Sequence, residues 1–486
     1  MNNKRILSVF FIPAIAFSFC SCGNENNIEL TSNTLSETTN IEVTTEATDE
    51  EWTMPEIVTI AEPITDINKI FENVEEGAFV PFQDPERSFC WNQEGYASKI
   101  LYQNTGSCDT YALSTVLSVN YQINHGKLPY FDPLTLLNRF YCSSDDKDEE
   151  KEGAYFVGGS AEDYGSFSLM GDVVALSCDQ YDGYLLKDLS VDMRLENDLP
   201  LITIDEMKEK IKEHGPVEIT VCGATDKAYK GMYTQSSMAQ TDHWAVIVGW
   251  DDDFPAADYF QTEPSQNGAW LIQNSGSMSW GNNGYAWVTY DYPLYYAVTA
   301  EVTEDYSYGI SNGNMYTCEV TLRDSDETSG ATIIDHEGML KAVGVYAADS
   351  VIDATVTIEI YDGEFGELLA STEGVMDYCG YHVFEFEEPV QVNKYTIVET
   401  IKGAPMAFEG SSFSYEGNGV RYDGNNWVEG KFGFVMKTEE GRSFLKAGDE
   451  WLDVLSSELE NNFKITYPEI CRGKNPGDLS VVALYE

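Results

Sequence analysis

Three residue types that together can activate a thiol occur at three separated places in the chain. They are Cys108, His243, which precedes the apolar run 244–248, and Asn274, which precedes a glycine-rich stretch over 275–285. A thiol is a weak nucleophile until it ionises, and a neighbouring imidazolium stabilises the thiolate. An amide oxygen can accept a hydrogen bond from the imidazole and fix its orientation. We therefore expect Cys108, His243 and Asn274 to form the catalytic group of a cysteine hydrolase.

The element that must position the thiol is predicted as a helix over Cys108–Asn124, because apolar residues recur there at steps of three and four. Cys108 then lies at the helix N-terminus, where the partial positive charge favours an anion. Ser107 can cap that helix. The tetrahedral intermediate needs donors for its oxyanion, and the Cys108 backbone N–H and the Gln103 side chain are the candidates.

The remaining pattern predicts an α+β region followed by an all-β region. Over 86–300, a helical half precedes a β half, with a further helix at Ile204–His214 and strands at Val217–Val221, His243–Trp250, Gly268–Gln273 and Tyr285–Tyr290. Over 301–486, short β-rich runs are separated by turn residues, which is typical of a sandwich; these runs are Leu340–Tyr346, Ala354–Tyr361, His382–Phe386 and Lys394–Ile401.

Each candidate also has a structural interpretation. Cys108 alone is more often a small buried hydrophobe, and an isolated histidine before an apolar strand is more often a structural one. The three residues together, in this order and in these local settings, favour the functional interpretation. The remaining histidines have no comparable context; they are His125, His214, His336 and His382.

Three stretches resemble the papain-like cysteine peptidases. Residues 103–108 are similar to the family's nucleophile motif, 242–250 to its histidine strand, and 269–285 to its asparagine strand and loop. Gly158 and Gly159 resemble the glycine pair that lines the family's cleft and pairs with substrate backbone. The resemblance implies a two-lobed α+β domain over 86–300, endopeptidase chemistry through an acyl-thioester, a protein or peptide substrate and no cofactor.

The C-terminal region resembles the lectin-like domain that follows this peptidase domain in some bacterial surface proteins. The stretches that carry the resemblance are 441–444, 451–454 and 468–472. The resemblance implies an all-β sandwich over 301–486 and makes a cell-surface glycan a candidate partner.

Three positions depart from the papain-like pattern. Asp109 stands where the family has a tryptophan, and its charge is expected to raise the pKa of the thiol. Gln103 precedes Cys108 by five residues, where the family has six, and Gly276 replaces a tryptophan that shields the Asn–His hydrogen bond. These departures leave a second hypothesis open, a non-catalytic protein that captures peptides or glycans, and a minor third, an amidohydrolase or acyltransferase.

Charge and length limit the partners. The 486 residues carry 28 Lys and Arg against 82 Asp and Glu, a net charge of −54, which disfavours nucleic acid and anionic membrane surfaces. Length predicts two or three domains. The ten cysteines show no metal-ligand spacing and do not fix any disulfide pairing, so we expect no metal.

The N-terminus is predicted to be a bacterial export signal over 1–22. Lys4 and Arg5 precede an apolar stretch, and the small Ser21 precedes Cys22, as in a lipoprotein signal, so we expect a lipid on Cys22 to hold the protein at the membrane. The alternative is an ordinary signal peptide. Residues 23–85 are predicted to be a Thr/Glu-rich tether and linker: 24–52 have almost no apolar periodicity, and 53–85, with a short helix expected at Ile67–Phe71, are interpreted as a linker, with a propeptide remnant as the alternative.

Overall fold

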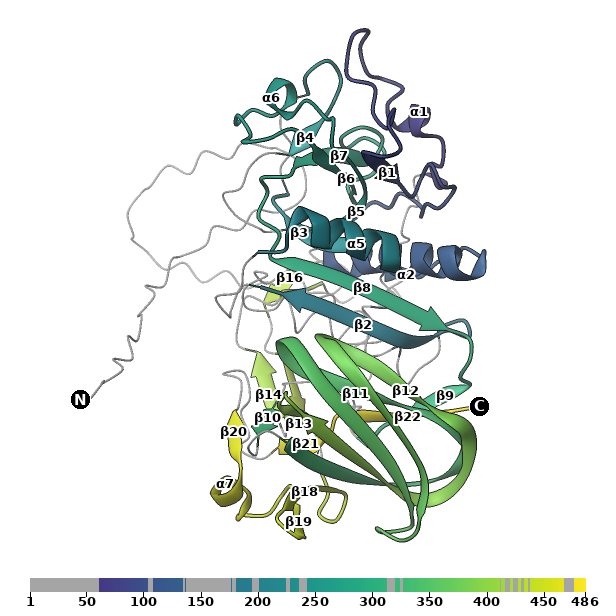
Figure 1. The fold of residues 1–486 in the computed structure, drawn as a ribbon, viewed down its shortest axis with the longest axis vertical. Helices are drawn as coiled ribbons and strands as arrows, with labels where there is room; N and C mark the ends of the chain where they lie inside the picture. Colours follow the sequence, from purple (N-terminus) through teal and green to yellow (C-terminus); the bar gives the residue numbers. More distant parts are fainter. Residues whose placement is uncertain are drawn as a thin grey trace, which may run out of the picture. The chain divides into compact units, whose positions relative to one another are not determined.

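The structure is a computed structural model, and Figure 1 shows its fold. It describes residues 61–103, 108–133, 136, 176, 181–194, 201–223, 228–235, 243–312, 320–323, 327–410, 412–415, 420–422, 427–429, 432–435, 438–466 and 476–486. The predictions for Ser107, Cys22, Gly158 and Gly159 lie outside these residues, as do those for the signal and most of the tether.

Two helices confirm the sequence predictions. Helix α2 (Cys108–His125) is buried from Asp109 to Tyr121, and Gly126 follows it with φ +72°. Helix α5 (Ile204–His214) begins with a capping box, in which the Thr203 side chain accepts from the backbone of Glu206 and the Glu206 side chain accepts from the backbone of Thr203. Within the described part of the chain, α1 (Ile67–Ile70) and α6 (Ala256–Tyr259) are single helical turns. Among the described residues, no helix is both long enough and apolar enough to cross a membrane.

His243 begins β5 (His243–Asp251), which confirms the strand predicted there, and most of the strand pairs around β5 are antiparallel. Strand β5 pairs with β3 (Val217–Val221), with β6 (Ala269–Gln273) and with the short β1 (Ser88–Cys90). Next to β6 lies β7 (Tyr285–Thr289), which also pairs in parallel with β4 (Thr234–Gln235). Every residue of β3, β5, β6 and β7 is buried, so both faces of these strands are covered by other parts of the chain.

Strand β2 (Leu185–Met193) was not predicted from the sequence. It pairs along its length with β8 (Tyr296–Thr303), which runs through the boundary expected at residue 300. Its other edge pairs with Cys379–His382 of the C-terminal region (Figure 1). The two regions of the chain therefore share one sheet.

The described part of the expected linker, residues 61–85, packs into the apolar core that lies around α2 and β5. Ile64, Ile70 and Phe82 are buried there, and the Phe82 ring lies 5.5 Å from that of Trp287, centroid to centroid. The Phe82 backbone N–H donates to the Asp251 carboxylate at 2.6 Å. We call residues 61–85 the strap; it is part of the domain that follows it, because its apolar side chains fill that domain's core.

The C-terminal region is built from strands, as predicted, apart from the single helical turn α7 (Leu459–Asn462). The predicted short runs are parts of two long bent strands, β11 (Glu327–Asp362) and β12 (Leu368–Lys402), which pair with each other and enclose a separate apolar core. The other strands are β9 (Tyr308–Ile310), β10 (Val320–Arg323), β13 (Met406–Gly410), β14 (Ser412–Tyr415), β15 (Val420–Tyr422), β16 (Trp427–Glu429), β17 (Phe432–Val435), β18 (Ser443–Ala447), β19 (Glu450–Asp453), β20 (Lys464–Thr466), β21 (Pro476–Leu479) and β22 (Val481–Tyr485).

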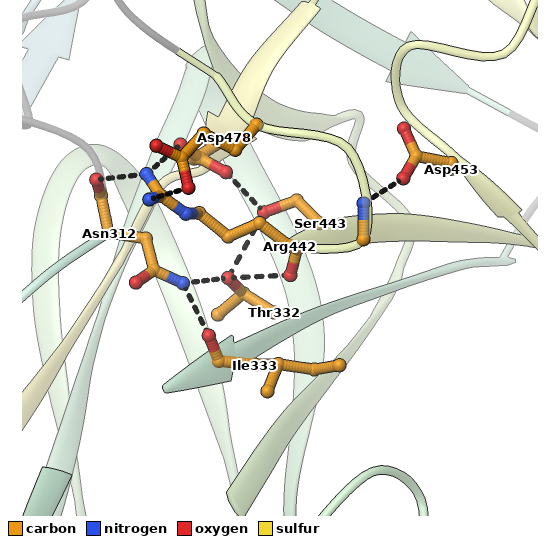
Figure 2. A network of polar contacts seen from close by, with 9 residues as sticks. Asn312, Thr332, Ile333, Arg442, Ser443, Asp453 and Asp478 are labelled. Atoms are coloured by element: carbon orange, nitrogen blue, oxygen red, sulfur yellow. Dashed lines mark hydrogen bonds and ion pairs between the residues drawn. The ribbon is translucent and has the colours of Figure 1, made fainter. Parts of the chain in front are cut away.

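Two residues of the motif at 441–444, Arg442 and Ser443, take part in a network of polar contacts between strands (Figure 2). The Ser443 hydroxyl donates to the Asp478 carboxylate at 2.8 Å and lies 3.0 Å from the Thr332 hydroxyl. Arg442 lies 3.6 Å from the other Asp478 oxygen. Burial raises the pKa of Asp478, while Ser443 and Arg442 oppose that rise. These residues come from β11, β18 and β21 and their flanks, so the motif holds the C-terminal strands together.

Candidate active site

Cys108 is the first residue of α2, and its partly buried thiol lies within hydrogen-bonding range of the Trp244 backbone N–H. Trp244 directly follows His243 in β5, and α2 packs against β5. The structure therefore brings the predicted nucleophile to the strand end that carries the predicted base.

Opposing groups act on the thiol. Burial, followed by the charge of Asp109, raises the pKa of the Cys108 thiol to about 12, whereas the backbone N–H groups of Trp244, Asp109 and Cys108 itself lower it. Asp109 is buried, so its charge is poorly screened by water. This effect of Asp109 confirms the direction expected from the sequence. Without a cation beside it, the thiol stays protonated at neutral pH.

His243 and Asn274 form the predicted hydrogen bond. Nε2 of His243 lies 2.6 Å from Oδ1 of Asn274, and the same Oδ1 accepts from the Ser275 backbone N–H at 2.7 Å. The Ser275 N–H is a donor, so the Asn274 side-chain atom that it contacts must be the amide oxygen rather than the amide nitrogen. An amide oxygen can only accept hydrogen bonds. Nε2 must therefore carry the hydrogen, which leaves Nδ1 as the nitrogen that gains and loses a proton.

Gly276 does not leave this hydrogen bond open to water, contrary to the expectation from the missing tryptophan. His243 is 5% exposed and Asn274 is 7% exposed. A Cβ atom built on Gly276 would lie 2.7 Å from both Cβ and Cγ of Trp280. Trp280 thus occupies the space that a side chain at position 276 would need.

Gln103 lies beside the same pair despite its altered spacing. Its side-chain oxygen accepts from the Ser275 hydroxyl at 2.6 Å, and its backbone N–H donates to the Ser275 carbonyl at 2.8 Å. With the oxygen held by Ser275, the amide N–H₂ is the end of Gln103 that can serve as a donor. Spacing from Cys108 did not predict this placement, because Gln103 is positioned by contacts with Ser275.

Ser275 and Trp280 are the site residues that sequence reasoning did not assign. Ser275 connects Gln103 to Asn274, and Trp280 packs beside Gly276. Both lie within the glycine-rich stretch that was quoted for its resemblance, but only three-dimensional contacts show what they do. In the described part of the chain, no group of three or more His, Cys, Asp or Glu side chains is placed to hold a metal ion.

A cysteine at the start of a helix packed against β5, a histidine at the first position of β5 and an asparagine directly after the adjacent antiparallel strand β6 together indicate a papain-like cysteine peptidase fold. The comparisons agree: the model of the papain family cysteine protease matches residues 172–318, a range that contains His243 and Asn274. Cysteine proteinase 1 of Zea mays is 22% identical over 231 residues, which are 45% of this chain. The chain spans 60% of the length of that curated relative.

Solved structures extend the similarity to the C-terminal region. The cysteine protease and lectin-like domains of Cwp84, a surface layer associated protein of Clostridium difficile, match with a TM-score of 0.56 and 14% identity, covering 90% of this chain and 99% of theirs. Clostridial Cwp84 after propeptide cleavage matches with a TM-score of 0.55 and 16% identity, covering 82% and 99%. The chain therefore has a papain-like cysteine peptidase fold followed by a lectin-like domain, as the sequence predicted.

Proposed function

We propose that this protein is a cysteine endopeptidase in which Cys108 is the nucleophile, His243 the general acid and base, and Asn274 the residue that orients His243. One observation carries the proposal. The bond between His243 Nε2 and Asn274 Oδ1 fixes the imidazole, while the thiol lies at the backbone N–H of the residue that follows His243. The substrate is a protein or peptide, and the reaction is hydrolysis of an amide bond.

The chemistry follows from these positions. The Cys108 thiolate attacks the carbonyl carbon, and its own backbone N–H together with the Gln103 amide stabilises the oxyanion. The C–N bond breaks as His243 Nδ1–H gives its proton to the leaving amine, and a thioester remains on Cys108. His243 then takes a proton from water as the water oxygen bonds to the thioester carbon; the C–S bond breaks, the carboxylic acid leaves, and the Cys108 thiolate beside protonated His243 is restored. Gly158 and Gly159 are proposed to pair with substrate backbone.

The proposed location is the bacterial cell surface, with the protein held by a lipid on Cys22. The signal-like residues 1–22 and the Thr/Glu-rich tether support this location. The fold of the lectin-like domain makes a surface glycan a candidate second ligand, which would keep the peptidase near its substrate.

A second function, capture of peptides or glycans without hydrolysis, is favoured by one observation. The pKa of Cys108 is raised to about 12, in part by the buried Asp109, and a protonated thiol does not attack a peptide bond. Catalysis requires that protonated His243 stabilise the thiolate against both effects.

The test is labelling of the soluble chain, begun after Cys22, with an active-site-directed epoxide that reacts with thiolates. Peptide mass mapping would locate the label. We expect labelling at Cys108, with a rate that falls at least tenfold in His243→Ala because the thiolate loses its partner. The exposed His214 supplies the control variant, His214→Ala, which should label like the natural chain.

Buried Cys90 is an internal control thiol and should stay unlabelled in the folded chain. An equal rate of Cys108 labelling in His243→Ala and in the natural chain would contradict the proposed pair. So would the absence of labelling at Cys108 in a folded chain, and either result would favour the capture function. If Cys108 is labelled and the labelling depends on His243, hydrolysis of a quenched peptide library by the same preparation would establish the peptidase directly.

A further inference from the structure

Tyr102 is an exposed aromatic residue fixed beside the candidate catalytic group. It is 45% exposed and forms an antiparallel bridge with Gly276. The next residue, Gln103, donates its backbone N–H to the Ser275 carbonyl at 2.8 Å. The backbone of Tyr102 is therefore held in place by the segment that follows Asn274.

The neighbours of Tyr102 show the alternation of a half-buried strand. Leu101 and Gln103 are buried, and the Leu101 carbonyl accepts from the Ser277 backbone N–H at 3.1 Å. Tyr102 points to the opposite, solvent side of this short ladder. A single exposed tyrosine is common on protein surfaces, so its significance rests on what lies next to it.

Gly276, the residue paired with Tyr102, has no side chain, so its backbone is not covered by one of its own. Directly opposed residues of an antiparallel pair project to the same face. On that face a Cβ at position 276 would meet Trp280 at 2.7 Å, and Trp280 is itself only partly buried. Tyr102 and Trp280 thus flank a strip of backbone that carries no side chain, and we call these three residues the aromatic shelf.

The chemistry of the site indicates which part of a substrate crosses the shelf. His243 gives its proton to the leaving amine, so the peptide beyond the broken bond must leave the thiol on the His243 side. Asn274 is bonded to His243, and Gly276 comes two residues after Asn274. Gly276, and Tyr102 opposite it, therefore lie in the segment that follows the histidine's partner, on the side toward which the leaving peptide departs.

We propose that Tyr102 is a specificity-determining residue, and that the aromatic shelf binds an apolar or aromatic side chain of the residue directly after the scissile bond. This inference rests on the proposed peptidase function. Tyrosine offers a large apolar contact area with little loss of conformational freedom, and Gly276 lets that side chain approach the backbone closely. A small or acidic residue at this position gains little from the shelf.

The test compares two series of internally quenched peptides. Both contain the same mixture of residues before the scissile bond and differ only in the residue after it, Phe in one series and Gly in the other. In the natural chain, we expect kcat/KM for the Phe series to exceed that for the Gly series. In Tyr102→Ala, this ratio should fall about tenfold, as for the loss of one aromatic contact worth ~1.4 kcal/mol. Tyr102→Phe keeps the ring and should keep most of the ratio.

Tyr229→Ala is the matched control, because Tyr229 is 48% exposed but its ring packs against Tyr259. That variant should retain the natural ratio. A ratio that is the same in Tyr102→Ala as in the natural chain overturns this inference alone, provided that the peptides are hydrolysed. A chain that hydrolyses none of the peptides overturns the proposed function and this inference with it, and the labelling of Cys108 tells the two failures apart.

Discussion

At the scale of single residues, reactivity at Cys108 depends on a balance between groups that favour the thiolate and groups that oppose it. Three backbone N–H groups favour the anion, whereas burial and Asp109 oppose it. Asn274 contributes indirectly, because it fixes which nitrogen of His243 can hold the exchanging proton. Asp109 is the opposing group that a single substitution can remove without opening a cavity.

We predict that Asp109→Asn lowers the pKa of the Cys108 thiol. The amide has almost the size of the carboxylate but carries no charge, so one of the two causes of the raised pKa is lost. The rate of alkylation by iodoacetamide at neutral pH should rise by about three- to tenfold, since one pKa unit is worth ~1.4 kcal/mol. Its pH profile, measured with peptide mapping, should move to lower pH.

Cys90 is the control for this prediction within the same molecule. Its thiol is also buried, and burial raises its pKa to about 12, but Asp109 is not among the causes. Alkylation of Cys90 should be equal in the variant and the natural chain. An unchanged profile at Cys108 would show that the Asp109 charge does not act on the thiol.

At the scale of elements, the strap shows how a stretch expected to be a linker can belong to a core. Ten of its 25 residues are apolar, and Phe71 and Phe82 both pack against Trp287 of β7. The Asp251 side chain of β5 accepts the Phe82 backbone N–H, and thereby ties the strap to the strand that carries His243.

We predict that Phe82→Ala destabilises the peptidase domain by about 3 kcal/mol. Truncation of a buried phenylalanine removes its apolar contact area and leaves a cavity beside Trp287. Val80→Ala, two residues earlier and 61% exposed, should change stability by less than ~0.5 kcal/mol. Urea unfolding monitored by tryptophan fluorescence measures both. Equal midpoints for the two variants would show that the strap is a loose linker after all.

Elements that form through local sequence patterns could be predicted from the sequence, whereas elements that depend on distant partners could not. Helices α2 and α5 and strands β3, β5, β6 and β7 follow from local periodicity and turn residues, and three of them carry Cys108, His243 and the residue before Asn274. Strand β2 has no partner nearby in sequence: β8 and β12, which pair with it, come at least a hundred residues later. Contacts between Gln103 and Ser275 are equally non-local, so spacing alone made Gln103 look misplaced.

At the scale of the whole molecule, the peptidase and lectin-like regions are joined by a shared sheet. Strand β2 pairs with β12 at four positions, and Lys210 of α5 places its ammonium 3.7 Å from the ring centroid of Tyr378. Nδ1 of His382 lies 2.8 Å from the Asp188 carboxylate at this junction, an ion pair when the histidine is protonated. Nε2 of the same histidine lies 2.9 Å from the Tyr378 carbonyl, so His382 satisfies both contacts only when both nitrogens carry hydrogen.

The pKa of His382 is raised in the folded chain. Burial opposes the charged form, but the hydrogen bond and charge of Asp188, the Tyr378 carbonyl and the charge of Asp377 together outweigh it. A raised pKa means that the folded state binds the proton more tightly than the unfolded state. The stabilisation is therefore complete below the unfolded pKa and is lost as pH rises through the folded value.

We predict that His382→Gln lowers the melting temperature most below pH 6 and progressively less at higher pH. A hydrogen bond to a charged partner is worth about 2 kcal/mol, so the difference at pH 5 should be a few degrees. Calorimetry from pH 5 to 9 measures it, with the exposed His214→Gln as the control for the loss of one imidazole. Asp188→Asn should remove most of the same pH dependence, because the charge that holds the proton is gone. A melting difference that does not vary with pH would mean that His382 stays neutral and that the junction is held by strand pairing alone.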